Sequence, residues 1–392
     1  MITSDVEDAY AEAFRTQVER SQDMAEHDEP GREFYYRPGE LVIGRADQEL
    51  VQRELLGLDS SGDVVRETED VVVLRVDRDI PSLLEQLRQP TRWTDRPAPA
   101  VQPHHLVVGF GNVMGHPTRP PTAARALSPP TGKAASAGKG VTVGICDTGI
   151  WKEAEERHPD WLAGRYVPQV PDHEDLFSEG GSDLDLQAGH GTFVAGVLRQ
   201  AAPGARFDPQ KALDASGFGD ELMLSAALDG LEPGVAVVNL SLGCVTADNL
   251  PSLPIARALA RLPRSVVVVA AAGNAGSDRV SWPAGFKRVL AVGAVEESAD
   301  GWVPSPWSNH GPWVDVSAGG LRTSTYVEGR MGVTGTVFRR FAQWAGTSFA
   351  APHVAGRIAA DLRPDEPSAW PAARRLLDQD PWHPDHGVLV VD

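Results

Sequence analysis

Residues 346–356 read GTSFAAPHVAG, in which a glycine turn leads into an apolar helix and Ser348 stands in the first turn. The small residues around Ser348 allow another backbone to approach it closely. A serine at this place lies in the positive end of the helix field, which favours negative charge that develops nearby. A serine hydroxyl is a weak nucleophile, so it needs a base, and the base needs a third group to orient it. A catalytic serine would therefore require a histidine and a carboxylate elsewhere in the chain.

Two other stretches place these residue types where the packing of a sheet or a helix does not explain them. Residues 145–149, ICDTG, put Asp147 at the end of an apolar strand. Residues 189–196, GHGTFVAG, put His190 between two glycines at the start of a helix. Taken alone, each would be an ordinary cap, loop or core residue. Together with the serine they supply a nucleophile, a base and a group that holds the base.

A side-chain amide completes this set. Residues 270–276, AAAGNAG, place Asn274 directly after another apolar strand. An amide N–H aimed at a carbonyl oxygen stabilises the charge of a tetrahedral intermediate. An ordinary turn is the alternative for this asparagine, but all four residues would then coincide with one mechanism by chance.

From residue 141 onward, continuous apolar strands alternate with helices. Apolar runs separated by helices predict a parallel sheet that is buried on both faces. Ligands bind such a sheet at the carboxyl ends of its strands. Strands are expected at 141–146, 235–243, 265–274 and 288–295, and helices at 190–200, 221–231, 254–262 and 348–362.

In this chain order, DTGI, GHGTFVAG, GN and GTSFAAPHVAG resemble the signature blocks of the subtilases, the subtilisin-like serine proteases of peptidase family S8. The resemblance covers about residues 138–363. It implies an α/β fold with a subtilisin-like parallel sheet flanked by helices, and serine endopeptidase activity. Carried over by position, Asp147 would orient the base, His190 would be the general base and then the general acid, and Ser348 would be the nucleophile. Asn274 and the backbone N–H of Ser348 would form the oxyanion hole.

The resemblance also implies where a protein or peptide substrate would bind. The reaction of such a serine protease needs no cofactor. Residues 241–243 match the family's edge segment, which pairs with the substrate backbone and reads main chain more than side chain. The stretch SWPA, from residue 281, matches the lining of the S1 pocket. It contains no acidic residue, so we expect an apolar or medium-sized side chain there. The expected substrate-binding residues are Ser241, Leu242, Gly243, Ala272, Gly273 and Ser281.

Three residues near the motifs depart from the family pattern or stand beside the expected site. Phe193 replaces a second histidine and Phe349 replaces a methionine that many members have, and both are expected to pack in the core. Cys146 precedes Asp147. Because successive strand residues face opposite sides, its sulfur should point away from the site.

Residues 37–110 alternate strands and helices in the order βαββαβ, the split βαβ plan of a small ferredoxin-like α+β domain. This order also resembles the subtilase propeptide, which packs on the protease as an intramolecular inhibitor. The tail that occupies the active site would then begin near Phe110. The expected strands are 40–44, 64–67, 71–76 and 105–109, and the expected helices are 47–56 and 80–87.

Composition changes along the chain predict the domain boundaries. The first residues are acidic and are expected to form a solvated surface helix. Prolines between the two folded parts predict a stiff, exposed connector that proteases can cut. The expected parts are an amino-terminal helix and extension at 1–36, the propeptide-like domain at 37–110, a Pro/Gly/Ala-rich linker at 111–139 and the catalytic domain at 140–392.

Bulk composition excludes several function classes. With a formal net charge of −18, the chain is repelled by phosphate backbones and anionic membranes, so no nucleic-acid partner is expected. Cys146 and Cys244 are too few for a disulfide framework. No stretch approaches the roughly 18 apolar residues of a membrane span. Asp5, Glu7 and Asp8 stand where a signal peptide needs basic residues, so cytoplasmic residence is expected, with non-classical export as the alternative.

No metal ligand set is assigned. Asp183 and Asp185 precede the GHGT stretch, and both bound structural calcium and a solvated acidic loop stay open as interpretations. His104 and His105 could form a metal pair, but adjacent strand residues face apart, which favours structural roles.

Two functions compete with a self-inhibited endopeptidase. One is a non-catalytic or permanently inhibited binding protein with the same fold, against which the complete set of catalytic residue types argues. The other is a peptide ligase or cyclase that uses the same acyl-enzyme, because the motifs do not distinguish water from an amine as the second nucleophile.

Overall fold

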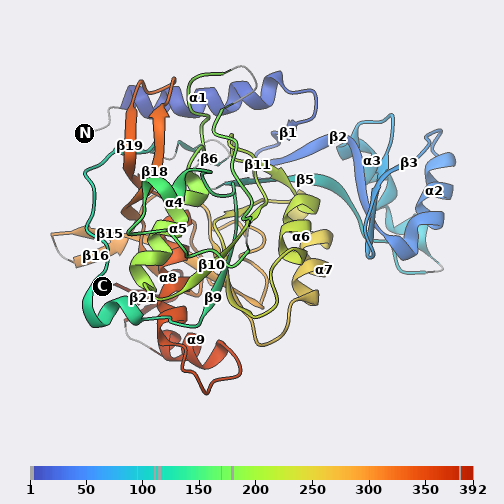
Figure 1. Ribbon diagram of the computed structural model, residues 1–392. Helices are drawn as coiled ribbons and strands as arrows, with labels where there is room; N and C mark the ends of the chain where they lie inside the picture. Colours follow the sequence, from blue (N-terminus) through green and yellow to red (C-terminus); the bar gives the residue numbers. More distant parts are fainter. Residues whose placement is uncertain are drawn as a thin grey trace.

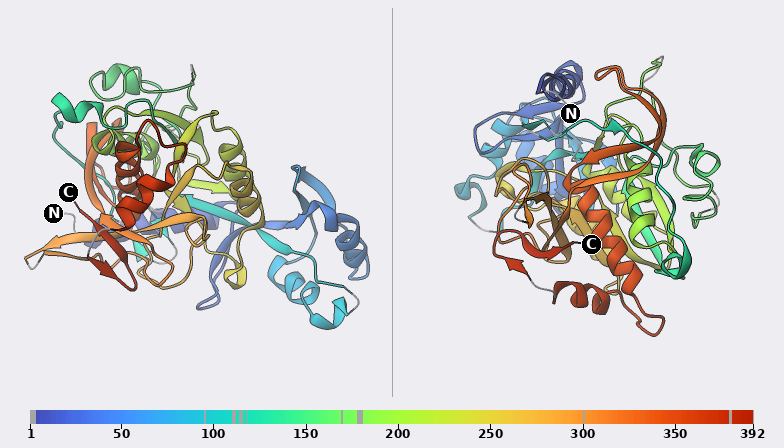
Figure 2. Two further views of the ribbon diagram at one scale, coloured as in Figure 1. Left: turned by 90° about the horizontal axis from the view of Figure 1, so that it is seen from below. Right: turned by 90° about the vertical axis from the view of Figure 1, so that its left-hand side faces the viewer.

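Two β-sheets organise the chain (Figure 1). The amino-terminal part forms a small domain that projects from one side of a larger body, as Figure 2 shows from a second direction. The larger body holds a parallel sheet covered by helices. The computed structural model describes residues 4–94, 96–109, 112–113, 116–117, 119–168, 170–177, 181–299, 301–378 and 381–391.

The small domain has the expected βαββαβ order. Its four strands pair antiparallel in the spatial order β5-β2-β4-β3, which is the arrangement of a split βαβ domain. Leu83 and Leu87 of α3 are buried in the core beside this sheet, and Asp79 caps the helix by accepting a hydrogen bond from Ser82 N at 3.0 Å. The elements are β1 (Ala25–His27), β2 (Phe34–Gly44), α2 (Gln48–Leu56), β3 (Asp63–Glu67), β4 (Val71–Arg75), α3 (Ile80–Leu87) and β5 (Val101–Gly109).

Strand β5 joins the two parts of the chain. Residues 101–105 pair with β2 in the small domain. Residues 106–109 continue into the large body, where they lie between β11 (Phe218–Asp220) and β13 (Leu242–Gly243), antiparallel to both. Figure 1 shows β5 running from the small domain toward β11. The strand is longer than the expected 105–109 because its first half completes one sheet and its second half enters another surface.

The central sheet has the strand order β10-β9-β12-β14-β15-β17-β21-β20. All neighbouring pairs in this order up to β21 are parallel, which confirms the expected parallel sheet. The last pair is antiparallel, as is β16 (Gly301–Pro304), which pairs with β15 off this order. Every residue of β14 is buried, as its continuous apolar sequence predicts. The strands are β9 (Thr142–Asp147), β10 (Arg206–Lys211), β12 (Val235–Leu240), β14 (Val267–Ala271), β15 (Val289–Ser298), β17 (Val316–Gly319), β20 (Trp382–His383) and β21 (Gly387–Val390).

Helices cover both faces of this sheet. Helices α5 (His190–Ala201) and α8 (Thr347–Asp361) share one core cluster with Val143 and Ile145 of β9. Helices α6 (Glu221–Asp229) and α7 (Leu253–Arg261) share the other cluster, which contains Cys146. The thiol therefore faces away from the α5 side, as predicted. Cys146 and Cys244 are not disulfide bonded.

A long hairpin, β18–β19, lies beside α5 and adds to the body. It pairs with β8 from the expected linker, so this part of the linker is a bound strand rather than a free connector. The remaining elements are α4 (Ala154–Arg157), α9 (Trp370–Leu377), β6 (Asn112–Val113), β7 (His116–Pro117), β8 (Thr122–Ala123), β16 (Gly301–Pro304), β18 (Leu321–Arg330) and β19 (Val337–Ala345), with 3-10 turns η1 (Arg45–Asp47), η2 (Pro90–Trp93), η3 (Gly132–Ser136) and η4 (Ala247–Asn249).

Helix α1 (Ser4–Arg20) forms as expected, but the expectation that it is a solvated surface helix is wrong. Tyr10, Phe14 and Val18 recur every four residues, line one face and are buried in the main core cluster. Phe14 stacks on Phe218 with ring centroids 4.6 Å apart. Figure 1 shows α1 lying across the large body rather than on the small domain.

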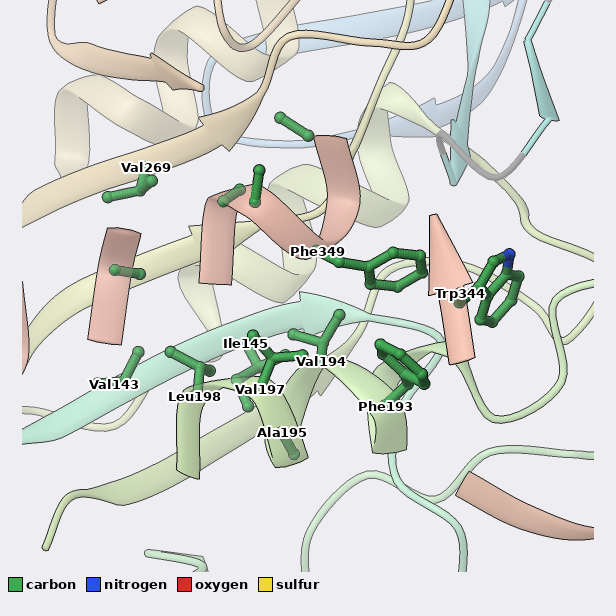
Figure 3. Close-up of a cluster of buried hydrophobic side chains, with 14 of the residues drawn as sticks. Val143, Ile145, Phe193, Val194, Ala195, Val197, Leu198, Val269, Trp344 and Phe349 are labelled. Atoms are coloured by element: carbon green, nitrogen blue, oxygen red, sulfur yellow. The ribbon is translucent and has the colours of Figure 1, made fainter. Parts of the chain in front are cut away.

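An aromatic cluster packs between the starts of α5 and α8 (Figure 3). The rings of Phe193 and Phe349 are 4.5 Å apart between centroids, and Trp344 lies 5.9 Å from Phe193 and 5.1 Å from Phe349. All three are buried. The expected packing role of the two phenylalanines is confirmed.

We expect Phe193→Ala to lower the free energy of unfolding by about 3–5 kcal/mol, because the truncation leaves a cavity among three aromatic rings. Guanidinium unfolding followed by circular dichroism measures this loss. The control is Phe177→Ala, whose side chain is exposed, and its effect should stay within about 0.5 kcal/mol. Equal effects of the two substitutions would contradict this packing.

Candidate active site

Asp147 and His190 meet at the carboxyl edge of the central sheet. Asp147 is the last residue of β9 and His190 is the first of α5. His190 Nδ1–H donates to Asp147 Oδ1 at 2.7 Å, and both side chains are buried. Gly189 before the histidine has a φ of 82°, and a Cβ there would come within 2.7 Å of the Tyr326 ring. A glycine is therefore required to aim His190 at the carboxylate.

This hydrogen bond selects the histidine tautomer. With the proton on Nδ1, the lone pair of the ring is on Nε2. Among the described residues, His190 Nε2 has no hydrogen-bond partner. The imidazole is therefore oriented on one side and able to accept a proton on the other.

Ser348 lies in the first turn of α8. The ring of Phe349, the next residue, is 5.3 Å from the His190 ring between centroids. Ser348 Oγ donates to the backbone oxygen of Ser241 at 3.2 Å, and not to His190. Ser241 Oγ in turn donates to the Ser348 carbonyl at 2.7 Å. The serine is thus held against the edge segment predicted to bind substrate.

Asn274 follows β14 and is fixed by the start of α8. Its Oδ1 accepts hydrogen bonds from Thr347 N and Thr347 Oγ1, both at 2.9 Å. These two donors fix the orientation of the amide. Asn274 Nδ2 lies beside Gly346, 3.3 Å from where a Cβ of that glycine would stand. An amide donor therefore stands at the turn that leads into Ser348.

The cleft beside these residues already holds an extended strand. Leu242 pairs with Gly109 and Gly243 with Val108, so the predicted edge segment does pair with a peptide backbone, and that backbone is β5. On its other side β5 pairs with β11, and Gly109 N donates to Gly217 O at 2.9 Å. The predicted tail near Phe110 lies outside the described residues.

The remaining predicted substrate residues are Ala272, Gly273 and Ser281, and Ser281 shares a cavity with β5. Ala272 is buried, and Gly273 N donates to Thr347 Oγ1 at 3.1 Å. Ser281 lines a cavity of about 740 Å³, which Leu106 and Val108 of β5 also line. The SWPA stretch itself contains no acidic residue, as its sequence states. The cavity extends beyond this stretch, and its lining also contains the acidic Glu26, Glu33 and Asp278 and the basic Arg279.

A buried charged cluster joins the small domain to the body. His104 Nδ1 lies 2.7 Å from Glu40 Oε2, and its Nε2 lies 3.5 Å from Asp220 Oδ1. Asp220 also accepts from Arg37 and Arg66, each at 2.9 Å, and it caps α6. His104 is therefore enclosed by carboxylates from both parts of the chain.

The neighbouring His105 has separate partners. Its Nδ1 lies 3.1 Å from Glu221 Oε1, and its Nε2 accepts a hydrogen bond from Ala247 N at 3.0 Å. Among the described residues, no group of three or more histidine, cysteine, aspartate or glutamate side chains is arranged to hold a metal ion. Asp183 forms an ion pair with Arg330 at 3.2 Å.

One residue of this region carried no signal in the sequence. Glu174 is buried behind Asp147 and His190, and its Oε1 accepts hydrogen bonds from Thr148 Oγ1 at 3.1 Å and Gly189 N at 2.5 Å. It stands in an acidic loop without a motif.

In the part of the chain that the structure describes, we also find no helix that is both long and apolar enough to cross a membrane.

The chain resembles known serine proteinases in sequence. The thermophilic serine proteinase of Bacillus sp. (strain AK1) is 33% identical over 235 residues, covering 56% of this chain and 51% of that protein. Subtilisin Savinase of Lederbergia lenta is 33% identical over 239 residues, covering 57% and 76%. The chain spans about half the length of the first of these and 56% of the M-protease of Shouchella clausii (strain KSM-K16).

Solved structures share the fold. Fervidolysin from Fervidobacterium pennivorans, a keratinolytic enzyme related to subtilisin, has a TM-score of 0.61 at 20% identity, covering 93% of this chain and 61% of that one. A lanthipeptide protease has a TM-score of 0.50 at 24% identity, covering 64% and 85%. The family model of the subtilases matches residues 138–377, which is well over half of the 392 residues. The chain therefore belongs to the subtilase family.

Proposed function

We propose that this chain is a serine endopeptidase made as a self-inhibited precursor. The observation that carries the proposal is the meeting of Asp147, His190 and the start of α8 beside a cleft in which β5 lies as an extended strand. The relatives named as serine proteinases and subtilisins support the same reaction.

The proposed mechanism follows from the hydrogen bonds of the site. Asp147 holds the proton of His190 on Nδ1, so Nε2 can take the proton of Ser348. Rotation about the Ser348 Cα–Cβ bond exchanges its bond to Ser241 O for one to His190. Attack on the substrate carbonyl then forms a tetrahedral intermediate. The Ser348 N–H and the N–H of Asn274 Nδ2 then donate hydrogen bonds to the oxyanion of this intermediate.

The second half of the reaction reverses the proton transfer. His190 gives its proton to the leaving amine, which departs and leaves the acyl group on Ser348. Water, activated by the same imidazole, then hydrolyses the acyl-enzyme. An amine in place of water would make the chain a ligase, and no contact of the described residues favours that outcome.

The placement of β5 supports the inhibitory role of the propeptide-like domain at 37–110. A substrate backbone would bind here as an added strand between β11 and β13, which is the place that β5 occupies. In the full chain Asp147, His190 and Ser348 have no exposed surface, and Asn274 is 1% exposed. This burial also motivates the second candidate, a permanently inhibited relative that never turns over.

Substitutions at the site test the activity. We expect Ser348→Ala to abolish hydrolysis of casein and of the chain itself, because the nucleophile is lost. Asn274→Ala should lower kcat by about 10²- to 10³-fold, the cost that is characteristic of subtilisin's own oxyanion-hole asparagine, with little change in KM. Rates are followed by fluorescence and mass spectrometry after prolonged incubation. Wild-type chain that hydrolyses nothing would favour the permanently inhibited relative, and activity that survives in Ser348→Ala would refute the assignment.

The charged cluster makes the closed form depend on pH. Burial lowers the pKa of His104, but its pairing with Asp220 and Glu40 outweighs burial and raises the pKa above its usual value. Burial raises the pKa of Glu40, but hydrogen bonds with His104 and Arg75 outweigh it and bring the pKa to about 2. The two carboxylates therefore favour the charged form of His104.

We expect the closed form to lose stability as the pH rises. A histidine whose folded pKa is raised stabilises fully below its unfolded pKa of about 6.5 and loses this contribution as the pH passes its folded pKa. In the Ser348→Ala background, the thermal midpoint should therefore fall as the pH rises above about 6.5, and His104→Gln should flatten this fall. The control is the exposed His383→Gln, which should keep the wild-type slope. Equal slopes in all three proteins would contradict the role of His104.

A further inference from the structure

The buried Glu174 contacts the backbone before His190 directly and is linked to the backbone after it through Thr148. Gly189 N–H donates to Glu174 Oε1 at 2.5 Å, directly before the histidine. Gly191 N–H, directly after it, donates to Thr148 Oγ1 at 3.0 Å. The Thr148 hydroxyl in turn donates to Glu174 Oε1 at 3.1 Å. A single carboxyl oxygen therefore organises the turn that begins α5.

The same network reaches Asp147. Thr148 N–H donates to Asp147 Oδ1 at 2.8 Å, the oxygen that also receives His190 Nδ1–H. The loop that carries Glu174 is tied to this strand end, because Glu174 N donates to Ile150 O at 3.0 Å. The positions of the carboxylate, the imidazole and Glu174 are thus coupled through the backbone of residues 148, 189 and 191 and through the Thr148 hydroxyl.

The surroundings of Glu174 favour its neutral form. Burial raises the pKa of its carboxyl group, and the nearby charge of Asp147 raises it further. Hydrogen bonds from Gly189 and Thr148 and the charge of Lys211 act in the opposite direction without restoring the ordinary value, so the pKa lies well above its usual range. Tyr326 on β18 is a further titratable group whose charge would interact with Glu174.

A neutral Glu174 suits the geometry. Its Oε1 accepts two hydrogen bonds, which a protonated carboxyl or an amide oxygen can do equally well. Among the described residues, Oε2 has no hydrogen-bond partner and can carry the proton. The group then holds the turn without adding a second negative charge beside Asp147.

We propose that Glu174 is a positioning residue for the reaction proposed above, a buried carboxyl group that sets His190 on Asp147 by holding the backbone before the histidine directly and the backbone after it through Thr148. This inference rests on the proposed function for its effect on rate. Glu174 lies 16 residues before His190 in the sequence, outside the motif that contains the histidine.

Two substitutions at one position separate positioning from charge. We expect Glu174→Ala to lower kcat by about 10- to 100-fold with KM changed less than about threefold, because small displacements of a catalytic group cost rates of this order. Glu174→Gln keeps the accepting oxygen and the neutral state, so its kcat should stay within about threefold of wild type. The acid limb of its kcat/KM profile should keep the wild-type midpoint.

A matched control separates positioning from a general loss of stability. Asp315 is another carboxyl group whose pKa burial raises, and its Oδ2 accepts a hydrogen bond from Ala291 N at 2.9 Å, away from the site. Asp315→Ala should lower the thermal midpoint without lowering kcat. If Glu174→Ala does not fold, Thr148→Val removes the hydroxyl that links Glu174 to Gly191 and should lower kcat about three- to tenfold, with Thr148→Ser restoring the rate.

A proton NMR measurement tests the same role without measuring turnover. The His190 Nδ1 proton, bound to Asp147, should give a far-downfield proton resonance in the full chain labelled with ¹⁵N-histidine. We expect the resonance in wild type and Glu174→Gln, and its loss or displacement in Glu174→Ala. No hydrolysis by wild type together with this pattern would overturn the proposed function alone. A wild-type rate and resonance in Glu174→Ala, or a Glu174→Gln variant as impaired as Glu174→Ala, would overturn the role of Glu174.

Discussion

The close packing of α5 against α8 on one face of the central sheet is the constraint on which the candidate site depends. Gly356 makes it possible, because a Cβ at this position would come within 2.5 Å of the Ala201 Cβ. The contact aligns the two helices so that their amino-terminal ends meet at the carboxyl edge of the sheet. His190 and Ser348 stand at these two ends, and Asp147 ends the strand beneath them.

The second constraint is the continuity of β5 through two environments. Its first half completes the small domain, and its second half supplies main-chain partners to β11 and β13. Backbone pairing carries little sequence information, so the specificity of this docking has to come from side chains. The cluster around His104, with Arg37 and Arg66 on one side and Asp220 on the other, provides it by charge complementarity in a buried place. In the proposed precursor, the same contacts that specify the small domain also make its docking sensitive to pH.

Local patterns were enough to predict most of the fold and the candidate site. Strand alternation gave the βαββαβ order, and polar residues at the ends of apolar strands identified Asp147 and Asn274. What could not be predicted depends on distant surfaces. Tyr10 and Phe14 lie on a helical stripe, but nothing in the local sequence says which surface buries it. Glu174 reaches His190 only through a loop whose path is set by pairing with Ile150. Such contacts arise from tertiary packing and leave no periodic or motif signal.

The most direct test of the account is covalent labelling of the full chain with a fluorophosphonate, read by intact and peptide mass spectrometry beside the Ser348→Ala form. The account predicts one adduct, on Ser348, whose rate rises when Arg37 and Arg66 are replaced by glutamine, because the small domain then leaves the cleft more often. Replacing the exposed Arg20 by glutamine should leave the rate unchanged. An adduct on another residue, or no adduct even when both interface arginines are replaced, would contradict the assignment of Ser348 as the nucleophile of a self-inhibited serine protease.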